Sequence, residues 1–262
     1  NGQADATTLN QIGAELVSKG VDLIVPIATP AVKIMQSATE DTEIPIVFSA
    51  VSDPVGAGIV DSLDAPGGRI TGTSDALNTK GLLDLMLAQN PDTKTVGLLY
   101  SNSEANSTTP IAEAKAYLDA KGIAYVEKTG NTNDEIMTAA SSMVGQVDAV
   151  FTPTDNTVMK SELTIYETFA EAGIPHYTGA DSFVRNGAYA TCGVNYTDLG
   201  AKTADLAYSA ITDGMDAMED YYLMDGGIIT VNTDTCALIG KQADYACFDS
   251  MGEVVEVTTT KD

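Results

Sequence analysis

Short apolar runs alternate with segments of helical periodicity along most of the chain. The apolar runs have the length of β-strands, and strands are predicted at residues 21–28, 44–51, 95–101, 123–129, 147–153 and 174–180. Segments with apolar residues at helical spacing are predicted as helices at residues 7–19, 30–39, 81–88, 109–120, 134–143, 157–172 and 199–212. Strands separated by single helices predict an α/β fold with parallel sheets and right-handed crossovers.

Two polar, turn-rich breaks divide this pattern into two lobes. The first break lies at residues 72–78 and the second at residues 193–195. The predicted helix at 199–212 returns the chain to the first lobe, and residues 215–225 cross once more. We therefore expect two doubly wound parallel-sheet lobes joined by a hinge. Their predicted bounds are residues 1–75 with 195–222 for the first lobe, and residues 76–194 with 223–262 for the second.

Most predicted strands end in small, hydroxyl, amide or carboxylate residues. The carboxyl ends of parallel strands lie along one edge of a sheet, where ligands bind in open α/β folds. None of these turns combines a nucleophile, a base and an orienting group, so the pattern favours binding over catalysis. The candidate ligand-binding residues are Thr29, Ser49, Ala50, Asp53, Ser101, Glu104, Asn106, Asp155, Asn156, Thr157, Asp181, Phe183, Asn195 and Tyr196.

Several of these candidates also have a purely structural interpretation. Asp155 and Thr157 either bind the head group of a ligand or cap the helix that follows them. A structural turn before Pro54 accounts equally well for residues 49–53, and ordinary loop polarity accounts for residues 104–106. Phe183 and Tyr196 each lie one turn from a polar strand end, which suits them to stacking on an aromatic ligand.

The charge of the chain excludes several classes of partner. The sequence has 262 residues, 44% of them hydrophobic, with 13 Lys and Arg against 37 Asp and Glu, and a formal net charge of −24. Such a surface repels nucleic acid and anionic membranes, and it keeps a protein soluble and monomeric. We therefore expect a monomer that binds no nucleic acid. The sequence contains no apolar run of the roughly 18 residues that a membrane helix needs.

Metal and cofactor chemistry finds little support in the sequence. Its three cysteines have no metal-ligand spacing, and His176 is the single histidine. A core or hydrogen-bonded role is predicted for that histidine. Residues 55–61, VGAGIVD, lack the third glycine of a dinucleotide turn. We expect no cofactor, no metal and no enzyme activity, and a disulfide between Cys236 and Cys247 stays open.

Five segments, in this order and spacing, resemble the extracytoplasmic substrate-binding proteins of ABC importers. They are SAVSDPVGAGIVDSL (49–63), PGGRITGTSD (66–75), TVGLLYSNSEANS (95–107), VDAVFTPTDNTV (147–158) and GADSFVRNGAYATCGVNYTDLG (179–200). The likeness is greater to the branch associated with uptake of tryptophan and related aromatic amino acids. It implies a type I periplasmic-binding-protein fold, and delivery of ligand to an ABC permease in the membrane.

This resemblance sharpens the expected function. It implies a solute-binding component for a small, aromatic, tryptophan-like amino acid bound in the interlobe cleft, located outside the cytoplasm as a cell-surface lipoprotein or a periplasmic protein. It also favours ligand binding for residues 155–157, and it places Asp181 at the cleft as the principal anchor for the ligand's ammonium group. The alternatives are a ligand-sensing module of the same fold without transport, or another small solute such as a nucleoside or sugar.

The chain departs from the family pattern at its beginning. Family members start with a further strand, helix and strand before the segment that resembles residues 7–19, and this chain begins after them. We therefore expect the first lobe to lack its amino-terminal strand–helix–strand. A helix cap for residues 182–185 remains the alternative role of Asp181.

Overall fold

The described residues form two compact units. The computed structural model describes the chain except for residues 3–4, 63–67, 216–217, 219–221, 224–225, 241–243 and 261–262. Unit 1 contains Asn1–Ala76 and Asn195–Asp225. Unit 2 contains Leu77–Val194 and Gly226–Asp262. The chain thus passes between the units three times, and the expected crossing at residues 215–225 lies largely outside the described residues.

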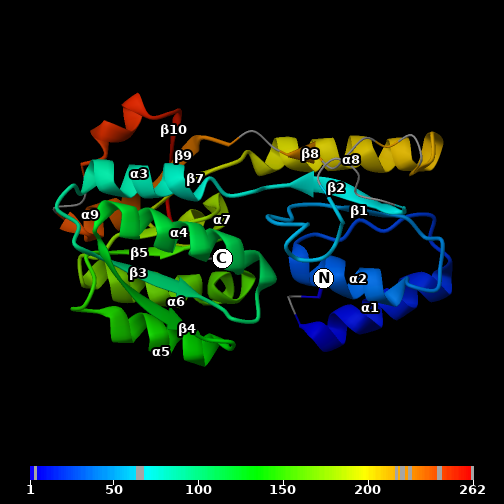
Figure 1. Ribbon diagram of the computed structural model, residues 1–262, viewed down its shortest axis with the longest axis horizontal. Coiled ribbons are helices and arrows are strands. Elements are labelled where there is room, and N and C mark those ends of the chain that lie inside the picture. Colours follow the sequence, from blue (N-terminus) through cyan, green and yellow to red (C-terminus); the bar gives the residue numbers. More distant parts are fainter. Residues whose placement is uncertain are drawn as a thin grey trace. The chain divides into compact units, whose positions relative to one another are not determined.

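Unit 1 has a small parallel sheet between helices (Figure 1). Its strands have the order β1-β2-β8, and α1 and α2 pack on one face while α8 packs on the other. Side chains alternate between these layers along β1: Ile46 and Phe48 join the core with α1 and α2, whereas Val47 packs against α8. The elements are α1 (Ala6–Lys19), α2 (Thr29–Ala38), β1 (Ile46–Phe48), β2 (Ile70–Ser74), α8 (Tyr196–Thr212) and β8 (Tyr222–Leu223).

The strand expected at residues 21–28 forms only in part. Two isolated parallel bridges, Ile24 to Ile46 and Ile27 to Ser49, join it to the chain at and just beyond β1. Pro26 lies between them and has no N–H to donate, so one bond of the ladder is missing and the strand is interrupted. The prediction of a continuous strand was therefore wrong.

Unit 2 is built on a seven-stranded sheet with the order β10-β9-β7-β6-β5-β3-β4. Its strands are β3 (Thr95–Tyr100), β4 (Ala124–Thr129), β5 (Ala149–Thr152), β6 (His176–Thr178), β7 (Ala190–Gly193), β9 (Ile228–Asn232) and β10 (Val254–Val257). All neighbours are parallel except β7 and β9, which pair with Gly193 opposite Ile228. The chain leaves unit 2 directly after β7 and returns just before β9, so it re-enters at the same end of the sheet and must run in the opposite direction.

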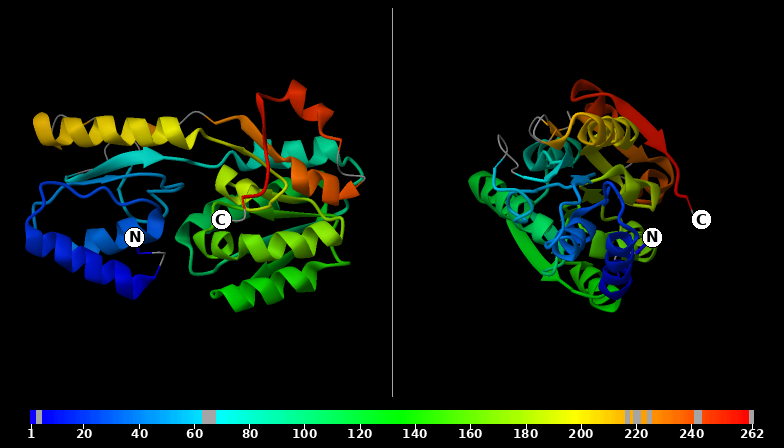
Figure 2. Two further views of the ribbon diagram at one scale, coloured as in Figure 1. Left: turned by 180° about the vertical axis from the view of Figure 1, so that it is seen from behind. Right: turned by 90° about the vertical axis from the view of Figure 1, so that its right-hand side faces the viewer.

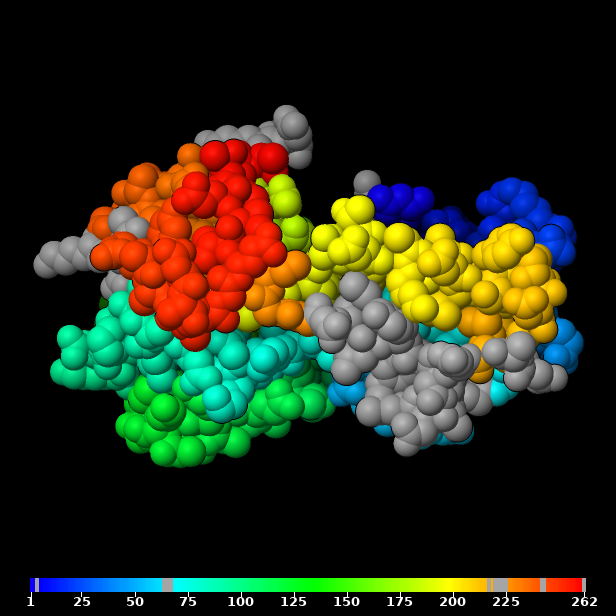
Figure 3. Space-filling view, turned by 90° about the horizontal axis from the view of Figure 1, so that it is seen from above, coloured from blue at the N-terminus to red at the C-terminus, as the bar shows by residue number. Residues whose placement is uncertain are grey.

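Helices cover both faces of this sheet, with α3 and α4 on one side and α5 and α6 on the other (Figures 1 and 2). The remaining short helices follow β3, β6 and β9 or precede β10, and η4 packs beside α3 (Figure 3). The elements are α3 (Thr79–Gln89), η1 (Ala105–Ser107), α4 (Thr108–Lys121), α5 (Asn133–Met143), α6 (Asn156–Glu171), α7 (Asp181–Arg185), α9 (Thr233–Leu238) and η4 (Ala246–Ser250).

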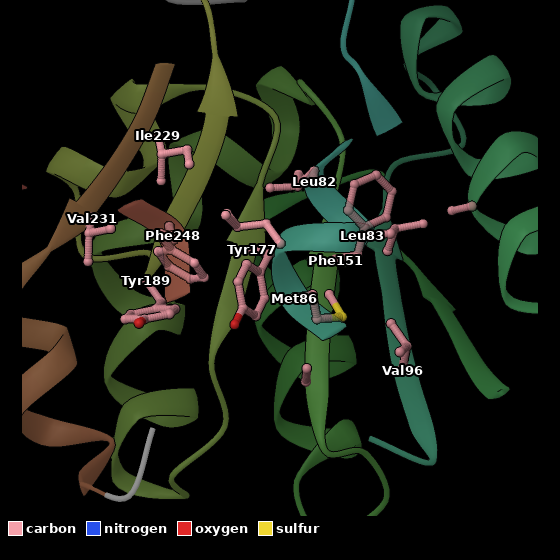
Figure 4. Packing of buried hydrophobic residues seen from close by; sticks show 14 of the residues in the cluster. Leu82, Leu83, Met86, Val96, Phe151, Tyr177, Tyr189, Ile229, Val231 and Phe248 are labelled. Carbon is pink, nitrogen blue, oxygen red and sulfur yellow. The ribbon is translucent and has the colours of Figure 1, made fainter. Parts of the chain in front are cut away.

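An apolar core joins α3 and α4 to the sheet of unit 2 (Figure 4). Tyr177 and Tyr189 lie in this core with no exposed surface, and their rings meet edge to face at 5.5 Å between centroids. Phe248 of η4 packs beside Tyr189, which anchors the carboxyl-terminal segment to the same core. The rigid sheet therefore holds the turns at its strand ends in fixed places.

Substitution of Gly72 tests the close approach of β1 and β2. A Cβ atom at Gly72 would lie 2.1 Å from the carbonyl oxygen of Phe48, so Gly72→Ala must shift backbone, and we expect it to reduce the free energy of unfolding by about 1–3 kcal/mol. Gly200 in α8 has open space around its Cβ position, and Gly200→Ala should raise that free energy by about 0.5–1 kcal/mol. Urea unfolding measures both, and equal stability of the two variants would contradict the expected strand contact.

Candidate functional site

The predicted residues divide between the two units. Unit 1 holds Thr29, Ser49, Ala50, Asp53, Asn195 and Tyr196. Unit 2 holds Ser101, Glu104, Asn106, Asp155, Asn156, Thr157, Asp181 and Phe183. They lie at the carboxyl ends of strands or at the helix starts that follow.

Three strand-end turns of unit 2 are tied together by hydrogen bonds. The amide of Asn106, after β3, donates to the carbonyl oxygen of Thr154, after β5. The Thr154 hydroxyl donates in turn to the carbonyl oxygen of Gly179, after β6, at 3.4 Å. A Cβ atom at Gly179 would lie 2.5 Å from the Thr154 nitrogen, so this close approach requires glycine. Sequence analysis missed the role of Thr154, although it stands in the polar turn that ends β5.

The carboxylate of Asp155 lies at the centre of these turns and is completely buried. One oxygen accepts hydrogen bonds from the backbone N–H groups of Thr157 and Val158, as an N-cap of α6 does. The other accepts from the N–H of Ser101 at 2.8 Å and from the hydroxyl of Ser107 at 2.7 Å. All these partners belong to unit 2, and this arrangement favours the helix-cap alternative for Asp155.

Glu104 is a second buried carboxylate at the same edge. Only 7% of the residue is exposed, and its oxygens accept hydrogen bonds from the Asn156 amide at 3.1 Å and the Thr157 hydroxyl at 3.3 Å. Burial, reinforced by the negative charge of Asp155, raises the pKa of Glu104 to about 7. Two residues further on, the side-chain oxygen of Asn106 is buried with no hydrogen-bond partner among the described residues. This edge of unit 2 therefore has more acceptors than donors.

The start of α7 differs from the expectation for Asp181 and Phe183. Asp181 is the first residue of α7, and the N-cap position, Ala180, makes no side-chain capping bond. The Asp181 carboxylate instead accepts a hydrogen bond from the Arg185 guanidinium at 3.0 Å. Phe183 is only 1% exposed, so its ring lies in the interior of unit 2, which argues against stacking on a ligand.

Two strained residues mark the strand ends of unit 1. Ala28 has φ 71° and ψ 150°, a region that glycine normally occupies, and Ala50 has φ 54°. In the part of the chain that the structure describes, they are the non-glycine residues with positive φ. A hydrogen bond from the Ala28 N–H to the Ser49 carbonyl joins the two segments at 3.0 Å. Such conformations cost about 1–3 kcal/mol each and cluster at functional sites.

Hydroxyl groups connect the ends of β1 and β2 to α8. The Thr203 hydroxyl lies 3.0 Å from that of Ser49 and 2.8 Å from that of Thr73. Thr29 is buried at the start of α2, which has no side-chain cap. The Asp53 carboxylate accepts a hydrogen bond from the Gly56 N–H at 2.7 Å, as expected of a structural turn.

Asp75 is a buried carboxylate that sequence analysis missed. It accepts hydrogen bonds from the hydroxyl of Ser52 at 2.9 Å and from that of Tyr196 at 2.6 Å. Burial raises the pKa of Asp75, and these two hydrogen bonds lower it in part. Asn195, next to Tyr196, caps α8 with its side-chain oxygen. The break expected at residues 72–78 was wrong in its first part, because β2 continues to Ser74 and Asp75 follows its end. The β-branched residues of β2 could have indicated this strand.

His176 forms a buried hydrogen-bonded chain with Thr152 and Glu162. Its Nε2 atom lies 2.8 Å from the Thr152 hydroxyl, and its Nδ1 atom lies 3.0 Å from the Glu162 carboxylate. The order hydroxyl, imidazole, carboxylate resembles a hydrolytic triad. All three residues are buried, however, and Thr152 has no exposed surface with which to reach a substrate. The prediction of a hydrogen-bonded core histidine is confirmed.

The described residues also bear on the questions of a disulfide, a metal site and a membrane helix. Among the described residues, Cys192, Cys236 and Cys247 form no disulfide with one another. Within the described ranges, no group of three or more His, Cys, Asp or Glu is placed to hold a metal ion, and no helix is long and apolar enough to cross a membrane. Two hollows of unit 2, of about 560 and 370 Å³, are lined by residues between 244 and 256 and between 128 and 142, and none of the predicted residues lines them.

Comparison with known families decides the class of this α/β protein. Residues 1–234 match the family described as ABC transporter substrate binding protein. The chain belongs to this family. The expected solute-binding component of an ABC importer is therefore confirmed, and the family consists of binding proteins rather than enzymes. Family members are extracytoplasmic and carry a small-molecule ligand to a transporter permease.

Individual relatives support the same family and fold. A tyrosine-binding protein of Clostridioides difficile (strain R20291) is 35% identical over 242 residues, which cover 92% of this chain and 70% of that protein. The structure of an ABC domain in complex with L-Trp from Streptococcus pneumonia is 31% identical with a TM-score of 0.87, covering 96% of this chain and 86% of that chain. The ligand-free, open structure of a Clostridium difficile substrate binding protein with adhesive properties is 34% identical with a TM-score of 0.70. The match covers 98% of this chain and 84% of that chain. The expected type I periplasmic-binding-protein-like fold is confirmed.

Asp155→Asn tests the structural role of this carboxylate within the family fold. The substituted amide keeps one acceptor, but its NH₂ group faces the Ser101 N–H or the N–H groups of α6. We expect the free energy of unfolding to fall by about 1–3 kcal/mol in a urea titration. Asp134→Asn, an exposed position in the first turn of α5, is the matched control and should change it by less than about 0.5 kcal/mol. Unchanged stability of Asp155→Asn would argue that the cap does not hold the turns together.

Tyr196→Phe tests the hydrogen bond to Asp75 through its pH dependence. Burial raises the folded-state pKa of Asp75, so the folded protein keeps this proton to higher pH and loses stability as pH rises through that pKa. Removing the Tyr196 hydroxyl raises the pKa further, so the destabilisation should be larger at about pH 8 than at about pH 5, reaching about 1–3 kcal/mol. Tyr208→Phe on the same helix is the control, because Tyr208 is 71% exposed. A pH-independent effect would contradict this assignment.

Proposed function

We propose that this protein binds an aromatic amino acid outside the cytoplasm, delivers it to an ABC permease and carries out no catalysis. Two relatives of the family support an aromatic ligand, one named for tyrosine binding and one solved in complex with L-Trp. The observation that carries the proposal is the acceptor-rich edge of unit 2, where Glu104 and Asn106 are buried without a cation. An ammonium group has three N–H donors and a positive charge, so it can donate to these acceptors and compensate the carboxylate's charge.

The carboxylate of an amino acid needs donors, and the start of α2 in unit 1 is the place that suits it. Helix α2 begins at Thr29 without a side-chain cap. Pro30 has no N–H and the Ala31 N–H already donates to the Ala28 carbonyl, which leaves the Thr29 N–H to an anion. Ala28, which immediately precedes it, holds the strained conformation described above. Strain of this kind is typical of backbone that is positioned for a ligand.

The aromatic part of the ligand requires apolar or aromatic surface. Of the two predicted stacking residues, Tyr196 retains an exposed part while its hydroxyl donates to Asp75. That hydrogen bond fixes the orientation of the ring and reduces the entropy lost on binding. Tyr196 therefore remains our proposed stacking residue, and Phe183 does not.

The remaining expectations from sequence stay predictions. They are a hinge that closes two lobes on the ligand, a monomeric state, and attachment as a cell-surface lipoprotein or residence in the periplasm. The net charge of −24 supports the monomer, because like-charged copies repel each other. A ligand-sensing module of the same fold and a nucleoside- or sugar-binding protein are the rival functions.

A thermal-shift screen tests the class of ligand. We expect L-tryptophan, L-tyrosine or L-phenylalanine to raise the melting temperature, since a ligand at about 100 times its dissociation constant adds about 2.7 kcal/mol of stability. D-enantiomers of the same amino acids are the matched controls and should shift it less, because their ammonium and carboxylate groups cannot both occupy the same positions. A shift with sugars or nucleosides and none with amino acids would overturn the proposal.

A further inference from the structure

We propose that Glu104 receives the ammonium group of the ligand, and that it releases a proton to solvent when the ligand binds. This inference rests on the proposed amino acid ligand and adds the identity of the anchor and a pH dependence. The sequence had assigned the anchor to Asp181 instead. Four observations lead to this change: the surroundings of Glu104, the neighbouring Asn106, the ion pair of Asp181, and the protonation of the buried carboxylate.

The surroundings of Glu104 provide hydrogen bonds but no positive charge. Its carboxylate accepts from the Asn156 amide and the Thr157 hydroxyl, both neutral groups of α6. Across the described ion pairs, no Lys, Arg or His lies within 4.0 Å of it. A buried carboxylate without a cation is costly when ionised, and Glu104 is only 7% exposed. A cationic ligand removes that cost.

Asn106 provides the second observation. It lies in η1, directly after Glu104, and is only 2% exposed. Its amide nitrogen is used by Thr154, whereas its side-chain oxygen has no partner in the part of the chain that is described. Buried acceptors are normally paired, so an unpaired one in this turn indicates a donor that arrives with the ligand. An ammonium group carries three N–H donors, so it can donate to an unpaired oxygen as well as to a carboxylate.

The other acidic residues of this edge already have partners. Asp181 accepts from Arg185 at 3.0 Å, so a cation of the protein itself neutralises it. The two oxygens of Asp155 accept four hydrogen bonds from unit 2. Glu104 is therefore the carboxylate whose charge is least compensated.

Protonation of Glu104 couples binding to pH. The charged group that faces it is Asp155 at the start of α6, and the donors Asn156 and Thr157 are neutral. Burial and this repulsion raise the pKa of Glu104 to about 7, so a large share of the ligand-free protein is protonated at neutral pH. The ammonium group favours the ionised carboxylate and displaces its proton to solvent, while the ligand keeps its own protons. Affinity must then rise with pH until the ligand-free carboxylate is ionised.

Calorimetric titration with L-tryptophan and L-tyrosine tests this coupling. The titrations are run at about pH 5.5 and about pH 8 in pairs of buffers with different ionisation enthalpies, which report the number of protons released. We expect the affinity of the wild type to rise by up to about tenfold per pH unit below the Glu104 pKa, with a proton released at the lower pH. Glu104→Gln should bind about 10–150-fold more weakly at about pH 8 and lose both the pH dependence and the proton release.

Two further variants make the assignment specific. Glu171→Gln, an exposed position at the far end of α6, is the control and should keep the wild-type affinity, pH profile and proton release. Asp181→Asn should also keep the wild-type proton release, because its partner is Arg185. A melting curve of each variant without ligand establishes folding, and the wild-type pH profile remains decisive if Glu104→Gln does not fold.

Three outcomes would overturn the inference. Wild-type binding that is independent of pH and releases no proton would do so while leaving amino acid binding intact. Loss of affinity in Asp181→Asn, with wild-type behaviour in Glu104→Gln, would return the anchor to Asp181. If neither amino acid binds at any pH, the proposed function fails and this inference fails with it.

Discussion

The hydrogen bonds to the Asp155 carboxylate hold the strand-end turns of unit 2 in place. One oxygen caps α6, and the other binds the end of β3 at Ser101 and the end of η1 at Ser107. A single buried group thus fixes the segment that carries Glu104 and Asn106. The hydrogen bonds from Asn106 through Thr154 to Gly179 extend the same arrangement to the end of β6. The geometry of the candidate site follows from this network.

The same network sets the electrostatics of the edge. Asp155 is satisfied by hydrogen bonds rather than by a cation, so its charge acts on Glu104 nearby. Burial opposes ionisation of both carboxylates, and their hydrogen-bond partners are all neutral, which leaves the edge short of positive charge. Asp75 of unit 1 is similar, because its carboxylate accepts hydrogen bonds from the hydroxyl groups of Ser52 and Tyr196. Both units therefore keep a buried carboxylate supported by neutral donors at their strand ends.

The α/β alternation, most strands and helices, and the polar strand ends could be predicted from sequence, because they depend on local periodicity and on turn chemistry. Local chemistry also explains the prediction that failed, since Pro26 interrupts the strand at residues 21–28. Even the pair of Asp181 and Arg185 was readable, because residues four apart on a helix meet. Strand β2, which ends at Ser74 just before Asp75, was missed because its polar residues resembled a break.

Tertiary structure decided which of these polar residues still have unused hydrogen-bonding capacity. Sequence placed Asp155, Glu104 and Asn106 at strand ends alike. Only packing shows that Asp155 accepts four hydrogen bonds, that Glu104 is buried with neutral partners alone, and that the Asn106 side-chain oxygen has no partner among the described residues. Phe183 likewise has a suitable position in the sequence, yet α7 lies against β6, β7 and β9 and its ring is enclosed. Burial and pairing depend on residues distant in sequence. For this protein, local sequence therefore determined where the strand-end turns lie, and only the folded chain determined which of them can accept a ligand.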